Sequence, residues 1–382
     1  MNRKITNVER LAAAYLAGHG NKQAEIARIL GISQAVVSRL LANTIGKYWR
    51  EQAEFIQGDV DEATMHVVLQ RIGKNKLAEA LTATVQQRSN RKRGPTLRVF
   101  SGGSLNATDR ERTEEFGRRA APYVQELLTR SRNCGLTWGR MLWHLVNSLR
   151  SSQVGNPWSS HQIDFVPLSG EPLGNNPTTF SSSSLAAELG RIANGGEYHA
   201  RSIAMVPAFI PEGFTAAQLR GVWKLIGLVP SYNEIFGTHG SSRRKRDGRV
   251  VDDLDMILTS VGPASKVLGF GAGRLFETGK LTIERLQSLV IGDMGGVCFP
   301  RPNLTPQERR ELKSVEVRWT GLEMINLEAC ATAAEADPTR PGVVVVSGGA
   351  ARAPFIHQTL EVINHLIIDD TLASELARLM DV

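Results

Sequence analysis

The sequence predicts a two-part chain, in which a small all-α segment precedes a larger α/β domain with a largely parallel sheet. The length of 382 residues favours more than one domain, because single hydrophobic cores stop growing near roughly 250 to 300 residues. Three short segments with helical periodicity lie within residues 1–42, whereas the remainder alternates helix-like segments with short apolar strands. Hydrophobic residues make up 42% and charged residues 22% of the chain, which is typical of folded globular proteins.

The N-terminal segment is expected to form three helices. The first covers residues 8–17 and should end at Gly18, because glycine is the usual C-terminal cap. The second covers about residues 22–30 and should end at Gly31. Ser33 is a favoured N-cap residue, so the third helix should begin directly after it.

The second and third helices have the spacing of a helix-turn-helix. Ala27 is small where the helices would cross, and Gly31 can adopt the positive φ of the turn. The expected core of this motif is Ile26, Leu30, Ile32, Val37 and Leu40. Polar side chains suited to base edges and phosphates remain for the exposed face, so we expect double-stranded DNA to contact Lys22, Gln23, Ser33, Gln34, Ala35, Ser38 and Arg39. The alternative is a small helical hairpin without a nucleic-acid function.

The charge distribution favours an acidic partner for the N-terminal segment. The chain has a net charge of +7, and residues 1–57 contain eight Lys or Arg against four Glu. Net charge alone is weak evidence, since many enzymes are moderately basic. We expect residues 1–57 to form the DNA-binding domain, residues 58–93 a helical linker that carries an oligomer contact, and residues 94–382 a separate domain. The basic runs at residues 91–93 and 243–246 are interpreted as solvated loops.

Several other classes of protein are not expected. Apolar stretches fall short of the roughly 20 residues that a membrane-spanning helix needs, and a polar helix, not a signal-peptide core, follows Arg3 and Lys4. Cys134, Cys298 and Cys330 lack metal-ligand or disulfide spacing, so we expect reduced thiols, a cytoplasmic protein and no metal. The glycines of residues 269–273 lack the flanks of a dinucleotide motif, so no cofactor is expected.

The larger domain is expected to contain a parallel sheet. Helices are expected over residues 114–129 and 141–149, and strands over residues 133–138, 163–168, 201–207, 254–261 and 343–346. In open α/β sheets, ligands bind beyond the carboxyl ends of the strands. The candidate binding loops are therefore those that follow such strands or contain paired glycines, at residues 135–140, 260–262, 291–296 and 347–352.

The chain resembles the SorC family of sugar-responsive bacterial transcriptional regulators. The resemblance rests on segments in a matching order: KQAEIARILGISQAVVSRLL, GLTWGRML, LDMILTSVG, VIGDMGGVCF and the C-terminal VVVVSGGAARAPFIHQTLEVINHLIIDDTLASELARLM. It implies a Rossmann-like α/β effector domain similar to the ribose-5-phosphate isomerase and glucosamine-6-phosphate deaminase fold. It also implies binding of a sugar or phosphosugar without turnover, and assembly as a dimer or tetramer. Relatives usually have lysine after the paired glycines where this sequence has Arg352, so the preferred effector can differ.

The candidate effector-binding residues lie in the loops identified above. A hydroxyl, backbone N–H groups and a guanidinium follow one strand at Thr137, Gly139 and Arg140, an arrangement suited to an anion. Arg352 stands at a helix start, where a cation is unfavourable unless an anion faces it. The resemblance implies that Asp255 and Asp293 accept hydrogen bonds from sugar hydroxyls, although aspartates in such places are often helix caps. The complete predicted set is Gly135, Thr137, Trp138, Gly139, Arg140, Asp255, Asp293, Gly348, Gly349 and Arg352.

No catalytic residue is expected, because these loops contain only scattered carboxylates and no acid–base pair. The main alternative is an active sugar-phosphate isomerase or deaminase that carries a DNA-binding arm. Oligomerisation is expected on physical grounds too, because one helix-turn-helix contacts few base pairs and useful affinity needs two half-sites.

Overall fold

The computed structural model describes residues 6–18, 21–42, 77–87, 94–103, 107–152, 158, 161–171, 178–195, 200–203, 206–237, 248–264 and 281–382. The chain divides into two compact units, Met1–Ala83 and Thr84–Asp381. This division falls within the linker expected over residues 58–93. Most of that linker, both basic runs and the glycines of residues 269–273 lie outside the described residues.

In the described part of the N-terminal unit, residues 6–42 form three helices: α1 (Asn7–Gly18), α2 (Gln23–Leu30) and α3 (Gln34–Ala42). Their apolar faces share one core that includes Leu11, Ile26, Leu30, Val37 and Leu40. Ile32, which was expected inside this core, is only partly buried against it. Residues 77–87 are also helical and agree with the helical pattern of the linker.

A six-stranded sheet forms the centre of the second unit, with every paired strand parallel. Its strand order is β1-β9-β8-β4-β2-β3. The strands are β1 (Thr96–Phe100), β2 (Asn133–Leu136), β3 (Asp164–Pro167), β4 (Met256–Thr259), β8 (Gly342–Ser347) and β9 (His365–Asp369). The parallel α/β sheet predicted from the sequence is confirmed.

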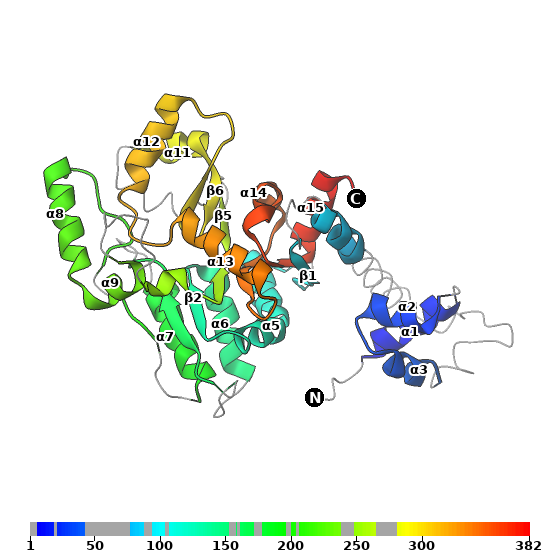
Figure 1. Ribbon diagram of the computed structural model, residues 1–382. Coiled ribbons are helices and arrows are strands. Elements are labelled where there is room, and N and C mark those ends of the chain that lie inside the picture. Colours follow the sequence, from blue (N-terminus) through cyan, green and yellow to red (C-terminus); the bar gives the residue numbers. More distant parts are fainter. Residues whose placement is uncertain are drawn as a thin grey trace. The chain divides into compact units, whose positions relative to one another are not determined.

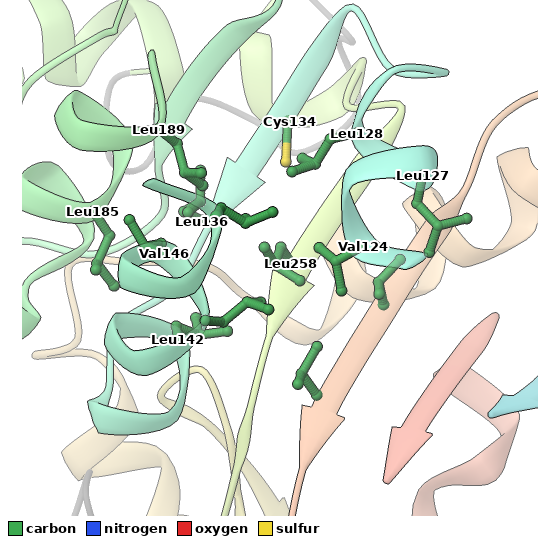
Figure 2. Packing of buried hydrophobic residues seen from close by; sticks show 14 of the residues in the cluster. Val124, Leu127, Leu128, Cys134, Leu136, Leu142, Val146, Leu185, Leu189 and Leu258 are labelled. Atoms are coloured by element: carbon green, nitrogen blue, oxygen red, sulfur yellow. The ribbon is translucent and has the colours of Figure 1, made fainter. Parts of the chain in front are cut away.

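Helices cover both faces of this sheet. One face is covered by α5 (Asp109–Leu128), α6 (Arg140–Ser152) and α7 (Ser182–Ala193), whose leucines pack on alternate strand residues such as Leu136 and Leu258 (Figure 2). On the other face α13 (Met324–Ala336) contacts β4 and β8. The last helices are α14 (Ala353–Thr359) and α15 (Asp370–Met380), which contact each other. Strand residues are buried on both faces, as parallel sheets require.

A smaller antiparallel sheet contains β5 (Val261–Pro263), β6 (Val290–Met294) and β7 (Val297–Pro300). Helices α11 (Ile283–Leu289) and α12 (Pro306–Glu316) lie beside it (Figure 1) and share its core with Trp319. The expectation that residues 291–296 form a loop after a parallel strand is wrong, because they form the β6–β7 hairpin. Paired glycines allow its two-residue turn.

Two of the strands expected from the sequence, at residues 201–207 and 254–261, differ in the structure. The described residues of the segment 201–207 form no strand; isolated bridges occur at Ala200, directly before the segment, and at Pro207. The strand expected over residues 254–261 is divided between β4 and β5. Two more helices, α8 (Ala216–Gly227) and α9 (Pro230–Phe236), contact each other.

Among the described residues, no helix is long and apolar enough to cross a membrane. The three cysteines are free and buried.

Candidate functional site

The exposed face of α3 is the first part of the candidate site. Within the N-terminal unit the side chains of Gln34, Ala35, Ser38 and Arg39 are exposed, whereas Val37 and Leu40 are buried. This spacing leaves one continuous face of α3 polar and basic. Lys22, Gln23 and Ser33 are exposed as well, so all seven residues predicted to contact DNA are accessible within this unit.

The turn between α2 and α3 has the geometry expected from its sequence. Gly31 has φ +61° and its N–H bonds the carbonyl oxygens of Ala27 and Arg28, which closes α2. Ser33 Oγ accepts a hydrogen bond from the Val36 N–H at 3.3 Å and caps α3. The helix-turn-helix geometry therefore follows from a glycine that permits the turn and a serine that begins the third helix.

The carboxyl edge of the parallel sheet is the second part of the candidate site. Strand β2 lies between β3 and β4, and the chain continues from β2 through α6 to β3 on one side. From β4 the chain instead reaches β8 on the other side. Connections that diverge in this way mark the place where open α/β sheets bind ligands. The ends of β2 and β4 therefore form the switch point of this sheet.

Thr137, the first residue after β2, is fully buried at this switch point. Its hydroxyl lies 3.0 Å from the Thr259 hydroxyl, and its N–H bonds the Leu258 carbonyl oxygen at 3.2 Å. The β6–β7 turn covers the pair so closely that a Cβ added at Gly295 would lie 2.3 Å from Thr137 Cγ2. Thr137 therefore joins two strand ends and holds the following loop in place, and its hydroxyl is not presented to a ligand.

Two tryptophans continue this packed region. The rings of Trp138 and Trp319 are 5.7 Å apart at an angle of 53°, and Trp138 remains partly exposed. A Cβ added at Gly296 would lie 2.2 Å from the Trp319 ring. The β6–β7 turn thus requires glycine at both positions, with φ +60° at Gly295 and +95° at Gly296.

Gly139 and Arg140 form the accessible end of the β2–α6 loop. Gly139 has φ +127°, and a Cβ added there would lie 3.4 Å from Ser260 Oγ, the hydroxyl that follows β4. The Gly139 N–H bonds the Phe180 carbonyl oxygen at 3.0 Å. Arg140 is exposed and begins the 13-residue helix α6, whose N-terminus carries partial positive charge.

The loop after β8 brings a second arginine to the same edge. Arg352 Nη1 donates to the Gly348 carbonyl oxygen, and its Nε lies 3.4 Å from the Val261 carbonyl oxygen. The Gly349 N–H donates to Asp369 Oδ1 at 3.0 Å. Ser347 is 1% exposed, and its hydroxyl has no hydrogen-bond partner among the described residues.

The two arginines affect each other electrostatically. Burial lowers the pKa of the Arg352 guanidinium, and the positive charge of Arg140 lowers it too, whereas Asp369 and Asp109 act in the opposite direction. Neither Arg140 nor Arg352 forms an ion pair with a residue that the structure describes. Partial burial next to a like charge is unfavourable for a cation unless an anion is present. The arrangement is therefore suited to an anionic ligand.

Three of the predicted effector-binding residues lie elsewhere. Asp255 precedes β4 at the amino edge of the sheet, where it bonds the N–H groups of Arg132 and Asn133 and pairs with Arg340. Asp293 is 3% exposed within β6, and its Oδ2 accepts a hydrogen bond from the Gly296 N–H at 2.9 Å, which closes the hairpin turn.

Gly135 is the third predicted effector-binding residue that lies away from these loops. It lies inside β2, where an added Cβ would approach Leu168 Cδ1 to 2.5 Å. Its role is close packing. The structure thus brings together Gly139, Arg140, Gly348, Gly349 and Arg352, with Thr137 and Trp138 beneath and beside the β2–α6 loop.

The acidic pair Asp369, which ends β9, and Asp370 was not among the predicted site residues. Asp369 caps α15 by accepting a hydrogen bond from the Leu372 N–H at 2.8 Å, and Asp370 accepts one from the Gly102 N–H at 3.2 Å. Arg112 of α5 donates to Asp370 at 3.2 Å. Two consecutive aspartates after the buried β9 were the available signal, but β9 itself was not predicted.

Within the described ranges, no three His, Cys, Asp or Glu side chains are grouped so that they could hold a metal ion.

The fold is similar to that of solved bacterial transcriptional regulators. The full-length sorbitol operon regulator SorC from Klebsiella pneumoniae is 20% identical, with a TM-score of 0.52 over 97% of both chains. A DeoR family regulator from Listeria monocytogenes is 15% identical, with a TM-score of 0.53 over 78% of this chain and 99% of that one. A domain of a possible sugar-binding transcriptional regulator from Arthrobacter aurescens TC1 is 16% identical, with a TM-score of 0.52 over 78% of this chain and 97% of that one.

The chain matches no protein-family model and no curated protein. At identities of 15% to 20% the similarity concerns the fold. The α/β unit with its carboxyl-edge loops therefore has the fold of these regulators' solved structures.

Proposed function

We propose that this protein is a DNA-binding transcriptional regulator whose affinity for DNA is changed by a sugar phosphate bound at the carboxyl edge of its parallel sheet. The observation that carries the ligand class is the pair Arg140 and Arg352, two cations that form no ion pair among the described residues, although Asp369 offsets part of the charge of Arg352. A phosphate supplies the missing negative charge and accepts charge-assisted hydrogen bonds from guanidinium groups.

The neighbouring groups are suited to the sugar. Ser260 Oγ lies close to Gly139, and Ser347 has a buried hydroxyl without a partner among the described residues. Hydroxyls both donate and accept hydrogen bonds, as sugar hydroxyls require. The partly exposed ring of Trp138 adds an apolar surface next to this loop.

The geometry favours binding without turnover over the enzyme alternative. A general base must be able to reach a proton of the substrate. Two of the aspartates near this edge are already engaged: Asp369 by the N–H groups of Gly349 and Leu372, and Asp370 by Gly102 and Arg112. Rapid conversion of ribose 5-phosphate or glucosamine 6-phosphate by the purified protein would contradict the proposal and establish the enzyme.

DNA binding is supported by the α3 face and its basic surroundings. In a helix-turn-helix this helix enters the major groove, where Gln34 is suited to adenine and Arg39 to guanine or phosphate. Similar solved structures include transcriptional regulators, which agrees with this assignment. We further propose a cytoplasmic homo-oligomer, a dimer or tetramer, because two half-sites are needed for useful affinity.

The DNA-binding part is tested by fluorescence titration of DNA upstream of the chain's own gene. The double variant Gln34→Ala, Arg39→Ala should bind at least tenfold more weakly, because it loses base-edge and phosphate contacts. Arg10→Ala on α1 removes the same net charge from an exposed site and serves as the matched control. Equal affinity of the double variant and the wild type would exclude α3 as the recognition helix.

The ligand-binding part is tested by thermal shift. Ribose 5-phosphate, glucosamine 6-phosphate and fructose 6-phosphate are compared with their unphosphorylated parents, because a ligand of the native state raises the melting temperature by mass action. At least one phosphate should stabilise the wild type and fail to stabilise Arg140→Gln, whereas the exposed control Arg220→Gln on α8 should behave as wild type. Stabilisation by the unphosphorylated parents alone would refute the anionic site.

A further inference from the structure

Arg112 occupies a buried position between two loops of the sheet edge. Its side chain is 12% exposed, and its Nη2 lies 3.2 Å from Asp370 Oδ1 and 3.8 Å from Asp369 Oδ2. One guanidinium therefore lies within ion-pair distance of two consecutive carboxylates. Buried carboxylates of this kind are costly without such a partner.

The two carboxylates bond different loops of the unit. Asp369 accepts a hydrogen bond from the Gly349 N–H, in the loop that carries Arg352. Asp370 accepts one from the Gly102 N–H, and Ser101 Oγ lies 3.4 Å from its other oxygen. Residues 101 and 102 directly follow β1. Arg112 thus lies where the candidate ligand loop meets the loop at the end of β1.

Strand β1 is the element of the sheet that lies nearest in sequence to the DNA-binding unit. The helix of residues 77–87 precedes it, and a Cβ added at Gly94 would lie 2.6 Å from the Gln86 Cα, so the end of this helix packs closely before β1. Residues 77–83 of the same helix belong to the N-terminal unit, where Glu79 pairs with Arg28 of α2 at 2.9 Å.

We propose that Arg112 is a positioning residue that transmits ligand occupancy from the Gly349–Arg352 loop to β1 and from there to the helix of residues 77–87. This inference rests on the proposed function, since it specifies how the same site is regulated. It requires no new contact between the ligand and Arg112.

The electrostatics indicate how the transfer works. Arg352 is attracted by Asp369, the carboxylate that also bonds Gly349. An anion bound beside Arg352 competes for that guanidinium and adds negative charge near Asp369. Arg112 then interacts more strongly with Asp369 and less strongly with Asp370. This change weakens the hydrogen bond that Asp370 accepts from the Gly102 N–H, in the loop that follows β1. A ligand acts at a distance only through such a difference between two states.

The variant Gly102→Ala tests the junction with one methyl group. Gly102 does not adopt the left-handed conformation, and its added Cβ would lie 3.0 Å from Arg112 Nη2 and 3.3 Å from Cζ. The methyl group therefore displaces the guanidinium without removing any charge. Gly221→Ala in α8 is the matched control, because no atom lies within 4 Å of its added Cβ.

The first readout needs no ligand. Amide hydrogen exchange of the full-length protein should show at least a threefold change in the rates of residues 77–87 in Gly102→Ala and wild-type rates in Gly221→Ala. Unchanged rates at residues 77–87 in Gly102→Ala would overturn the proposal. This outcome is independent of whether any sugar phosphate binds.

The second readout measures the response of DNA binding to the sugar phosphate that stabilises the wild type most in thermal shift. An allosteric ligand typically changes affinity about 5- to 150-fold. Gly102→Ala should still bind that sugar phosphate, but its DNA affinity should change less than twofold on adding it. If the wild type binds no sugar phosphate, the proposed function fails; if Gly102→Ala responds as the wild type does, only the role of the junction fails.

Arg112 itself is tested by two substitutions, one that keeps the positive charge and one that removes it. Arg112→Lys retains a cation between the carboxylates and should keep a partial response, whereas Arg112→Met should abolish it. A purely structural role would lower the melting temperature of both variants while leaving the DNA response of the folded protein intact, and that result would contradict the proposal. If Arg112→Met does not fold, Gly102→Ala and Arg112→Lys decide the question.

Discussion

The β6–β7 turn allows a quantitative test of the switch-point geometry through Gly295→Ala. Two costs apply. The residue has φ +60°, a left-handed conformation that costs an L-residue about 1 to 2 kcal/mol. The new Cβ would also lie 2.3 Å from Thr137 Cγ2 and 3.0 Å from Thr259 Oγ1, and such overpacking costs about 1 to 3 kcal/mol. We therefore expect Gly295→Ala to lower the free energy of unfolding by about 2 to 5 kcal/mol.

A control within the same unit separates these two costs. Gly248 has φ +67°, but no atom lies within 4 Å of its added Cβ. Gly248→Ala should therefore lower the free energy of unfolding only by the cost of the left-handed conformation, about 1 to 2 kcal/mol. The free energies of unfolding are measured by urea denaturation, followed by near-ultraviolet circular dichroism of the buried tryptophans.

A double variant identifies the contact. Thr137→Ser removes Cγ2 but leaves the hydroxyl that faces Thr259. It should recover about 1 kcal/mol of the Gly295→Ala loss, as a favourable coupling in a double-mutant cycle. Equal losses for Gly295→Ala and Gly248→Ala, with no coupling to Thr137→Ser, would refute the idea that the hairpin turn packs directly on the switch point.

Three further predictions concern stability. Burial lowers the pKa of His365 to about 4, below the ordinary value near 6.5. As pH falls from about 6.5 to 4, the unfolded state therefore takes up a proton that the folded state does not, and the free energy of unfolding falls by up to about 3 kcal/mol. Urea denaturation at several pH values should show a smaller fall in His365→Gln. Ser33→Ala should lower the stability of the N-terminal unit by about 1 kcal/mol in thermal denaturation, because the α3 cap is lost; an unchanged midpoint would contradict the cap. Gly135→Ala should cost about 1 to 3 kcal/mol in urea denaturation, because its Cβ would lie 2.5 Å from Leu168 Cδ1, and a neutral effect would contradict the close packing of the Leu168 side chain on Gly135.

The N-terminal unit was predictable because its signals are local. Helical periodicity, Gly31 at the turn and Ser33 at the cap each act within a few residues, and the structure has all three as expected. The strand at residues 343–346 was equally clear, because four consecutive valines are typical of a strand buried on both faces.

The site at the sheet edge was only partly predictable, because it depends on tertiary pairing. Asp293 follows apolar residues in sequence as a strand-end ligand would, yet antiparallel pairing with β7 places it in a hairpin whose turn it closes. Asp255 lies at the beginning of the strand predicted over residues 254–261, but its position before β4 puts it at the opposite edge from Arg352. Sequence identifies a strand, whereas its direction in the sheet decides which end carries the ligand loops.

The junction at Arg112 could not be predicted, because its partners are distant in sequence. Arg112 and Asp370 are separated by 258 positions. Arg112 lies on a helix rich in charged residues, where an exposed ion pair is the ordinary interpretation. Only the packing of α5 against the loops after β1 and β9 shows that this arginine is buried.

The proposed function is tested by the dissociation constant of the full-length protein for its upstream DNA, measured by fluorescence anisotropy with and without each sugar phosphate. The account predicts that one of these ligands changes the dissociation constant at least fivefold in the wild type, whereas its unphosphorylated parent does not. In the double variant Arg140→Gln, Arg352→Gln the same ligand should change it less than twofold, because the anionic group loses both cations. Tight DNA binding that no sugar phosphate alters, or a response that persists in the double variant, would contradict the account.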